Sequence, residues 1–203
     1  MNSINVNFDN LNENERKQLL SLVEKSNKGV RLSEIPVGGT FKIDDVEFIK
    51  FTEEGGTAIA VTRDCVFKSE FGNNNNLKDS TVLKRLNKEF LPKIIEAVGV
   101  ENICDTTTIL TTLDGLKPYE NITSKVTLPE YDFYRKNVEI FDKYPVNCWW
   151  WTATPESAKP HDAPNWIVCV SPSGIIINNI CNNYIGVRPF LCFVSSIFVS
   201  RSE

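Results

Sequence analysis

The hydrophobic periodicity of the chain changes twice, and this order limits the fold more than any single motif does. Between residues 40 and 62, apolar and polar residues alternate in three runs separated by acidic and glycine-containing turns. Such runs predict a β-meander. Between residues 83 and 95 apolar residues recur at helical spacing, and from residue 166 to 193 strand-like runs return. This order predicts an α+β domain rather than repeated βαβ units.

Two helices are expected between the two groups of strands, packed on twisted antiparallel sheets. Asp79 or Ser80 is suited to cap the first helix. Pro92 predicts a break near Leu91, because the residue before a proline avoids the α region. Thr127 and Glu130 have the spacing of a capping box, so the second helix is expected to begin at residue 127.

The N-terminal 30 residues differ from the rest of the chain. The length of 203 residues fits one domain with a small appendage. Good helix formers dominate residues 13–25, where Leu19, Leu20 and Val23 form a narrow apolar stripe. We therefore divide the chain into an N-terminal helical segment, residues 1–30, and a domain, residues 31–203. One short helix cannot bury its own stripe, so it is expected to dock on the domain or to mediate self-association.

Composition and charge narrow the classes of partner. Hydrophobic residues make up 41% of the chain and charged residues 24%, which is typical of a soluble globular protein. A net charge of −4 with interspersed signs argues against a nucleic-acid-binding protein. No apolar run is long enough to span a bilayer, so membrane insertion is not expected. The N-terminus also lacks the pattern of a secretory signal, which favours the reducing cytosol.

The six cysteines contain no Cys-x-x-Cys pair of the kind used by zinc or thiol-redox sites. Three disulfides are one alternative for an even number of cysteines. Without a signal sequence, free and mostly buried thiols are the favoured expectation.

Catalysis and metal binding have little support in the sequence. His161 is the single histidine, and a Ser-His-Asp or Cys-His arrangement would have to use it. It lies in a proline-punctuated loop, which favours an exposed position without a catalytic role. No metal-ligand spacing and no phosphate-binding glycine loop is present. We therefore expect neither an enzyme, a metal site nor a cofactor.

All four tryptophans lie between residues 149 and 166. On a strand, Trp149 and Trp151 would face one side and Trp150 the other, so at least two of the three are expected in the core as structural residues. Arg188 has apolar neighbours and is expected to be structural as well. Its guanidinium should be paired internally, because an unpaired buried charge is costly.

An asparagine-rich segment separates two of the apolar runs near the C-terminus. Four amides there cannot all be satisfied inside a core, so we expect them to face water or a ligand. An inert solvated loop is the alternative. The expected ligand-binding residues, with the last two at the rim, are Asn178, Asn179, Asn182, Asn183, Tyr184, Trp166 and His161. Rigid aromatic rings beside adaptable amides are typical of a recognition surface.

Three motifs follow one another at residues 149–155 (Trp-Trp-Trp-Thr-Ala-Thr-Pro), 170–174 (Val-Ser-Pro-Ser-Gly) and 186–190 (Gly-Val-Arg-Pro-Phe). With residues 71–76 (Phe-Gly-Asn-Asn-Asn-Asn), they resemble a family of uncharacterised bacterial and phage domains with C-type-lectin-like folds. The likeness covers roughly residues 32–200. These domains are similar to the variable proteins of diversity-generating retroelements and, remotely, to formylglycine-generating enzymes.

The resemblance implies a scaffold with an irregular C-terminal surface that presents variable residues to a partner. It implies a phage- or prophage-encoded protein, located in the bacterial cytoplasm or in a phage particle, that binds a cell-surface protein or glycan. A structural component of a virion or tail is the alternative, and an oxidase is a remote one. The Glu-Pro-Asn and Trp-Asn-Asp motifs of calcium-dependent lectins are absent from the sequence. Cys181 and Cys192 are farther apart than the cysteine pair of the oxidases, so neither calcium-mediated sugar binding nor oxidase activity is transferred.

Overall fold

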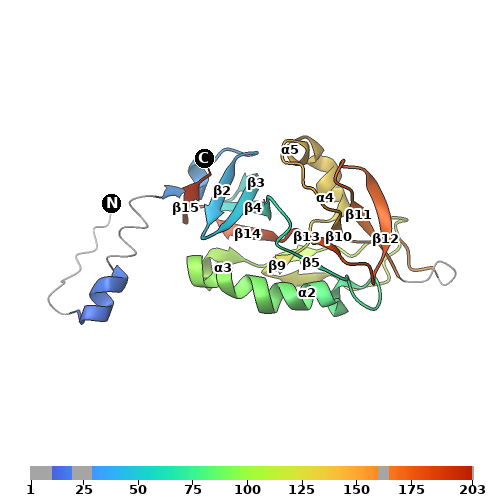
Figure 1. The fold of residues 1–203 in the computed structure, drawn as a ribbon, viewed down its shortest axis with the longest axis horizontal. Helices are drawn as coiled ribbons and strands as arrows, with labels where there is room; N and C mark the ends of the chain where they lie inside the picture. Colours follow the sequence, from blue (N-terminus) through green and yellow to red (C-terminus); the bar gives the residue numbers. More distant parts are fainter. Residues whose placement is uncertain (1–10, 20–28, 160–164, 203) are drawn as a thin grey trace.

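The computed structural model describes residues 11–19, 29–159 and 165–202. These residues form a mixed α/β protein in which antiparallel sheets predominate and helices are few (Figure 1). The predicted combination of helices and antiparallel sheets is confirmed at this level.

The larger sheet is antiparallel throughout and contains eight strands. Its order is β1 (Val30–Arg31), β15 (Phe198–Arg201), β2 (Thr40–Ile43), β3 (Val46–Glu54), β4 (Thr57–Thr62), β14 (Phe190–Val194) and β6 (Ile103–Cys104), with β9 (Val126–Thr127) also paired to β14. Strands β2, β3 and β4 are the predicted meander. The pairing of β1 with β15 brings the first and last strands of the domain together.

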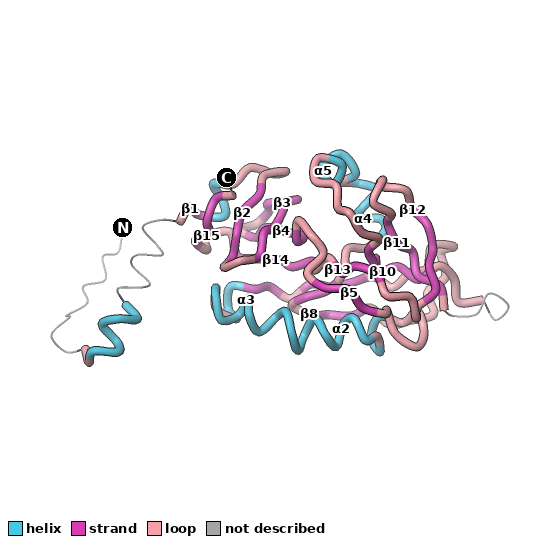
Figure 2. The backbone as a smooth tube through the Cα atoms, viewed as in Figure 1, coloured by secondary structure: helices cyan, strands magenta, loops and turns pink. Residues whose placement is uncertain are grey.

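The second sheet contains five strands in the order β12 (Ile176–Ile180), β11 (Trp166–Val170), β10 (Trp150–Pro155), β13 (Ile185–Val187) and β5 (Phe67–Ser69). Its pairs are antiparallel except for β10 and β13, which run parallel. A separate ribbon pairs β7 (Thr106–Thr108) with β8 (Ile122–Ser124). The first half of the asparagine-rich segment, residues 177–180, therefore falls on β12 at one edge of the second sheet (Figure 2), and the rest lies in the turn to β13.

The first predicted helix continues past the residue before its proline. The Ser80 hydroxyl accepts a hydrogen bond from Leu83 N and caps α2 (Thr81–Arg85). A π-helical stretch (Leu86–Phe90) then leads directly into α3 (Leu91–Val98), with Pro92 in the first turn of α3. The expected break near Leu91 is thus wrong. A wider π turn removes the conflict with the proline ring without ending the helix.

The second helix begins four residues later than expected. Thr127 belongs to β9, and its hydroxyl lies 2.8 Å from that of Thr108. Helix α4 (Tyr131–Lys136) follows Glu130, and α5 (Val138–Asp142) follows a turn at Asn137. The capping-box spacing is a local signal, and here the pairing of β9 with β14 outweighs it.

Two apolar clusters lie on opposite faces of β10, because successive strand residues point to opposite sides. Trp151 belongs to the cluster beneath α2 and α3, whereas Trp150 belongs to the cluster beneath α4 and α5. Two of the three tryptophans are therefore core residues, as expected. Trp149 precedes β10 and is 38% exposed. Its structural contribution is made by its backbone carbonyl, which accepts a hydrogen bond from Gly186 N.

A buried lysine, which the sequence patterns do not indicate, fixes the first residues of the domain against the larger sheet. Lys50 on β3 is fully enclosed and donates hydrogen bonds to the carbonyls of Leu32 (2.9 Å) and Ile35 (2.7 Å). It also pairs with Glu53. Leu32 begins the 3-10 turn Leu32–Glu34, so the lysine fixes this turn against the larger sheet.

The N-terminal segment is helical at residues 13–19, and its helix starts at a capping box. The Asn12 side chain accepts a hydrogen bond from Glu15 N, and the Glu15 carboxylate accepts one from Asn12 N. Leu20 and Val23 of the expected apolar stripe lie outside the described residues, so self-association stays a prediction. None of the described helices has the length and apolar character needed to cross a bilayer.

Candidate functional site

The candidate site lies on β12 and on the turn that connects it to β13. Asn182, Asn183 and Tyr184 are exposed in that turn, and the Tyr184 side chain is 66% exposed. Asn178 and Asn179 are half-buried on β12 itself. All five expected residues are therefore at the protein surface to some degree. The turn runs from the β12 edge to β13, which is separated from β12 by β11 and β10 in the sheet, so Tyr184 lies away from that edge.

The strand geometry divides this group between two faces of the sheet. Asn178 donates a hydrogen bond to the Glu156 carboxylate on one face. Asn179, which points to the other side, accepts a hydrogen bond from the Asn183 amide. A ligand that contacted all five residues would have to cover the edge of β12 rather than lie on one face of the sheet.

Tyr184 has a basic neighbour that the sequence alone did not associate with it. Arg85 at the end of α2 interacts with the Tyr184 hydroxyl and stacks on Phe67, with the guanidinium carbon 4.1 Å from the ring centroid. The side-chain hydrogen bond with Glu89 raises the pKa of Arg85, and Tyr184 raises it further. The exposed tyrosine therefore lies beside a permanently charged guanidinium, which is itself held by a ring and a carboxylate.

A buried asparagine fixes the backbone at Ser157 and Trp166, next to the site. Asn75 is 0% exposed, and its amide donates hydrogen bonds to the carbonyls of Ser157 (2.8 Å) and Trp166 (3.3 Å). Its carbonyl oxygen accepts a hydrogen bond from the Tyr119 hydroxyl at 2.5 Å. Asn75 belongs to the run of four asparagines at residues 73–76. Its side chain connects three segments of the chain through hydrogen bonds.

The two residues expected at the rim differ in how far the structure describes them. Trp166 begins β11 and is 37% exposed. In the register of β11 and β12 it faces Ile180, two residues beyond Asn178 on the same face. Trp166 and Asn178 are therefore diagonal neighbours on β11 and β12, on the same face of the sheet. His161 lies outside the described residues.

Arg188 is buried and paired internally, as expected, and its hydrogen-bond partner among the described residues is a backbone carbonyl. Its side chain is 1% exposed, and Nε donates a hydrogen bond to Thr62 O at 3.0 Å. The guanidinium carbon lies 5.1 Å from the ring centroids of both Phe141 and Trp150, whereas Nη2 has no hydrogen-bond partner. Burial lowers the pKa of Arg188 to about 10. Packing against rings, rather than an ion pair, holds this side chain in place.

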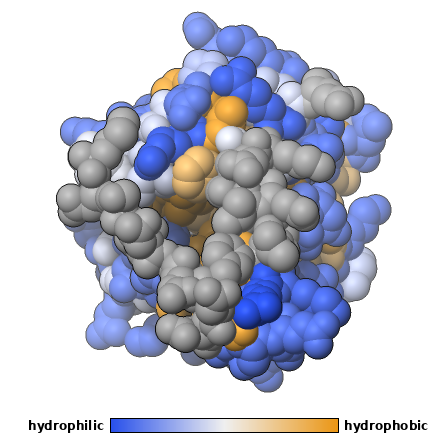
Figure 3. All heavy atoms as spheres, turned by 90° about the vertical axis from the view of Figure 1, so that its left-hand side faces the viewer, coloured by the Kyte–Doolittle hydropathy of each residue, from blue (hydrophilic) through white to orange (hydrophobic). Residues whose placement is uncertain are grey.

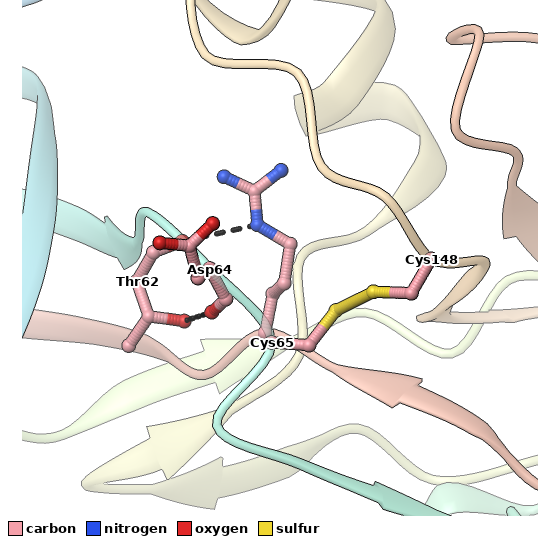
Figure 4. Close-up of a disulfide and its surroundings, with 5 residues drawn as sticks. Thr62, Asp64, Cys65 and Cys148 are labelled. Atoms are coloured by element: carbon pink, nitrogen blue, oxygen red, sulfur yellow. Dashed lines mark hydrogen bonds between the residues drawn. A yellow bond between two sulfur atoms is a disulfide. The ribbon is translucent and has the colours of Figure 1, made fainter.

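Cys65 and Cys148 form a disulfide, so the expectation of six free thiols is wrong for this pair (Figure 4). Cys65 lies in the loop from β4 of the larger sheet to β5 of the second sheet, and Cys148 lies just before β10 of the second sheet. The disulfide therefore links this loop to the start of β10. The partners are 83 residues apart in sequence. Spacing within the sequence cannot reveal such a pair, because only the packing of the sheets brings it together.

The other four cysteines are free thiols. Burial raises the pKa of both Cys169 and Cys181 to about 12, which makes their thiols unreactive at neutral pH. Among the residues that the structure describes, no three His, Cys, Asp or Glu side chains are grouped as metal ligands would be.

We compared the chain with models of known protein families, with curated proteins and with solved structures. None of the three comparisons gave a match.

Proposed function

We propose that this protein is a non-catalytic ligand-binding protein that uses the edge of β12 and the following turn as its recognition surface. The observation that carries this proposal is the exposure of Tyr184 together with Asn182 and Asn183 in the turn from β12 to β13, each of which is paired with other strands of the second sheet. A ring on a rigid scaffold contributes contact area at a low cost in conformational entropy, and amides adapt their hydrogen bonds to the partner.

The ligand that this surface fits is a protein or glycan on a cell surface. Hydroxyl and amide groups of a glycan match the asparagine amides, and a tyrosine ring packs against a sugar face or a protein side chain. Strand β12 has a strand partner on one side only among the described residues, so its other side offers backbone groups to an extended peptide. A C-type-lectin-like fold and a phage or prophage origin are parts of the same proposal and rest on the sequence motifs.

The opposite end of the molecule offers a less favourable surface. Figure 3 shows that the described surface at the β15 end is mainly hydrophilic, with apolar residues near the middle of the view and a few at its margins. Phe198 on β15 is exposed there, and its ring is covered in part by the Arg31 guanidinium at 5.2 Å. Phe198 thus provides a control position for an exposed aromatic residue outside the proposed surface.

Labelled protein applied to a glycan microarray and to intact bacterial cells tests the proposal. The triple variant Asn182→Ser, Asn183→Ser, Tyr184→Ala should lose binding but keep its melting temperature, because exposed positions contribute little to stability. Phe198→Ala should bind like the parent. Protease treatment of the cells separates a protein ligand from a glycan. Unchanged binding by the triple variant would place the recognition surface elsewhere.

An assembly role in a virion or tail is the alternative function, favoured by the free edge of β12. Sedimentation of the parent and the triple variant distinguishes the two roles. Self-association through β12 that the triple substitution abolishes would favour assembly over recognition of a cell surface.

A further inference from the structure

Two of the free thiols lie opposite one another on neighbouring strands of the larger sheet. Cys104 on β6 and Cys192 on β14 are direct register partners in antiparallel strands. Directly opposed residues in such a pair have Cα atoms about 4.5 or 5.5 Å apart and point to the same face of the sheet. Both distances fall within the range of about 4.4–6.8 Å that a disulfide requires.

The environment of the pair differs from that of the other free cysteines. Cys104 and Cys192 are both half-buried, whereas Cys169 and Cys181 are enclosed. The two side chains also interact: burial raises the pKa of Cys192, the neighbouring Cys104 raises it further, and the Thr57 hydroxyl opposes the shift. Their partial exposure lets a small oxidant reach the pair, and their position opposite one another lets the second thiol resolve a mixed disulfide formed on the first.

We propose that Cys104 and Cys192 form a redox site whose co-substrate is a small-molecule disulfide of the glutathione class. One cysteine, as thiolate, attacks a sulfur of the oxidised glutathione and releases one glutathione thiolate. The second cysteine attacks the protein sulfur of the resulting mixed disulfide and releases the second glutathione. Each cysteine loses one proton, and the two electrons pass to the glutathione disulfide, which is reduced to two thiols.

The position of the site gives the bridge a structural consequence. The chain between β6 and β14 contains α4, α5 and strands β10 to β13, including the edge of β12. A bond between Cys104 and Cys192 would join the two ends of this segment on the larger sheet. The Cys65–Cys148 disulfide already ties the same segment to the connection between β4 and β5. The proposal does not depend on the ligand-binding function.

The test measures thiols in the folded protein before and after exposure to oxidised glutathione. The protein is incubated with the oxidant, alkylated in denaturant and analysed by intact mass and peptide mapping. We expect the loss of two thiols without a glutathione adduct, and a linked peptide pair that contains Cys104 and Cys192. Cys65 and Cys148 already form a disulfide, so they contribute no thiol to this count.

Two variants and an unfolded control make the outcome specific. Cys104→Ser should stop the reaction at a glutathione adduct on Cys192, whereas Cys169→Ser should lose the same two thiols as the parent. Oxidation in urea should lose the selectivity for this pair, because strand pairing sets it. A parent protein that keeps all its thiols, or that carries a persistent glutathione adduct on either cysteine, would overturn the proposal.

Discussion

Gly186 lies directly against the sulfur of Cys65, so that a Cβ atom at position 186 would overlap it. The same Cβ would lie 2.9 Å from Cys148 Sγ and 2.8 Å from Trp149 O, closer than real Cβ atoms approach other atoms. The backbone N–H of Gly186 donates to that tryptophan carbonyl at 2.7 Å. The glycine of the Gly-Val-Arg-Pro motif is thus required by a close approach to the disulfide.

We expect Gly186→Ala to lower the free energy of unfolding by about 1–3 kcal/mol, the usual cost of overpacking. Urea unfolding measures the change. In a Cys65→Ala, Cys148→Ala background the cost of Gly186→Ala should shrink, but it should not vanish because the Trp149 carbonyl remains. An equal cost in both backgrounds would show that the sulfur atoms do not restrict this position.

The disulfide itself predicts a thiol count. Denatured protein that has not been reduced should titrate four thiols, those of Cys104, Cys169, Cys181 and Cys192. The Cα atoms of Cys65 and Cys148 are 7.5 Å apart, beyond the usual range of about 4.4–6.8 Å, so this count is the direct test of the bridge. The bridge should contribute about 2–4 kcal/mol, measured as the loss of stability on reduction. Six titrating thiols would contradict the bridge.

The surroundings of Arg188 predict that packing contributes more than charge. Arg188→Ala should cost about 2–5 kcal/mol, because it removes a buried side chain between Phe141 and Trp150 and leaves the Thr62 carbonyl without its donor. Arg188→Met fills much of the space without burying a charge, so it should cost less than half as much. Urea unfolding of both variants decides the matter, and a methionine variant as unstable as the alanine variant would favour the charge.

Asn75 should be far less tolerant of substitution than its neighbours in the asparagine run. Asn75→Ala leaves the Tyr119 hydroxyl and the Ser157 carbonyl without their partner, which should cost about 2–4 kcal/mol. Asn73→Ala, at an exposed position of the same run, serves as the matched control and should change stability by less than about 0.5 kcal/mol. Thermal unfolding of the two variants measures the difference, and equal melting temperatures would contradict the assigned network.

Glu130 should contribute a specific pH dependence. Burial raises the pKa of Glu130 above its ordinary value of 4.5, although a hydrogen bond from Ile109 N opposes the shift. A carboxyl whose folded-state pKa is raised contributes stability below its unfolded pKa and loses it as the pH rises through the folded value. Relative to Glu130→Gln, the parent should therefore lose stability as the pH rises above 4.5. Parallel pH profiles of the two proteins in urea unfolding would contradict the shift.

The sequence determined the local elements of the larger sheet. Alternation and turn residues were sufficient to predict β2, β3 and β4, since the period of a strand and the chemistry of a tight turn are local properties. The same alternation predicted that Trp150 and Trp151 would enter different surroundings. The C-terminal asparagine run was likewise recognisable as surface from its polarity.

Only the tertiary structure decided which polar side chains are buried and which residues meet. Asn75 and Asn73 have the same side chain, yet Asn75 is enclosed and Asn73 is exposed. The difference arises because the segments that contain Tyr119 and Ser157 pack over Asn75 and hydrogen-bond to it. Cys65 meets Cys148, and Cys104 faces Cys192, across long stretches of chain. Such partners depend on how sheets and helices pack together, and this packing is a sum over contacts that no local pattern in the sequence displays.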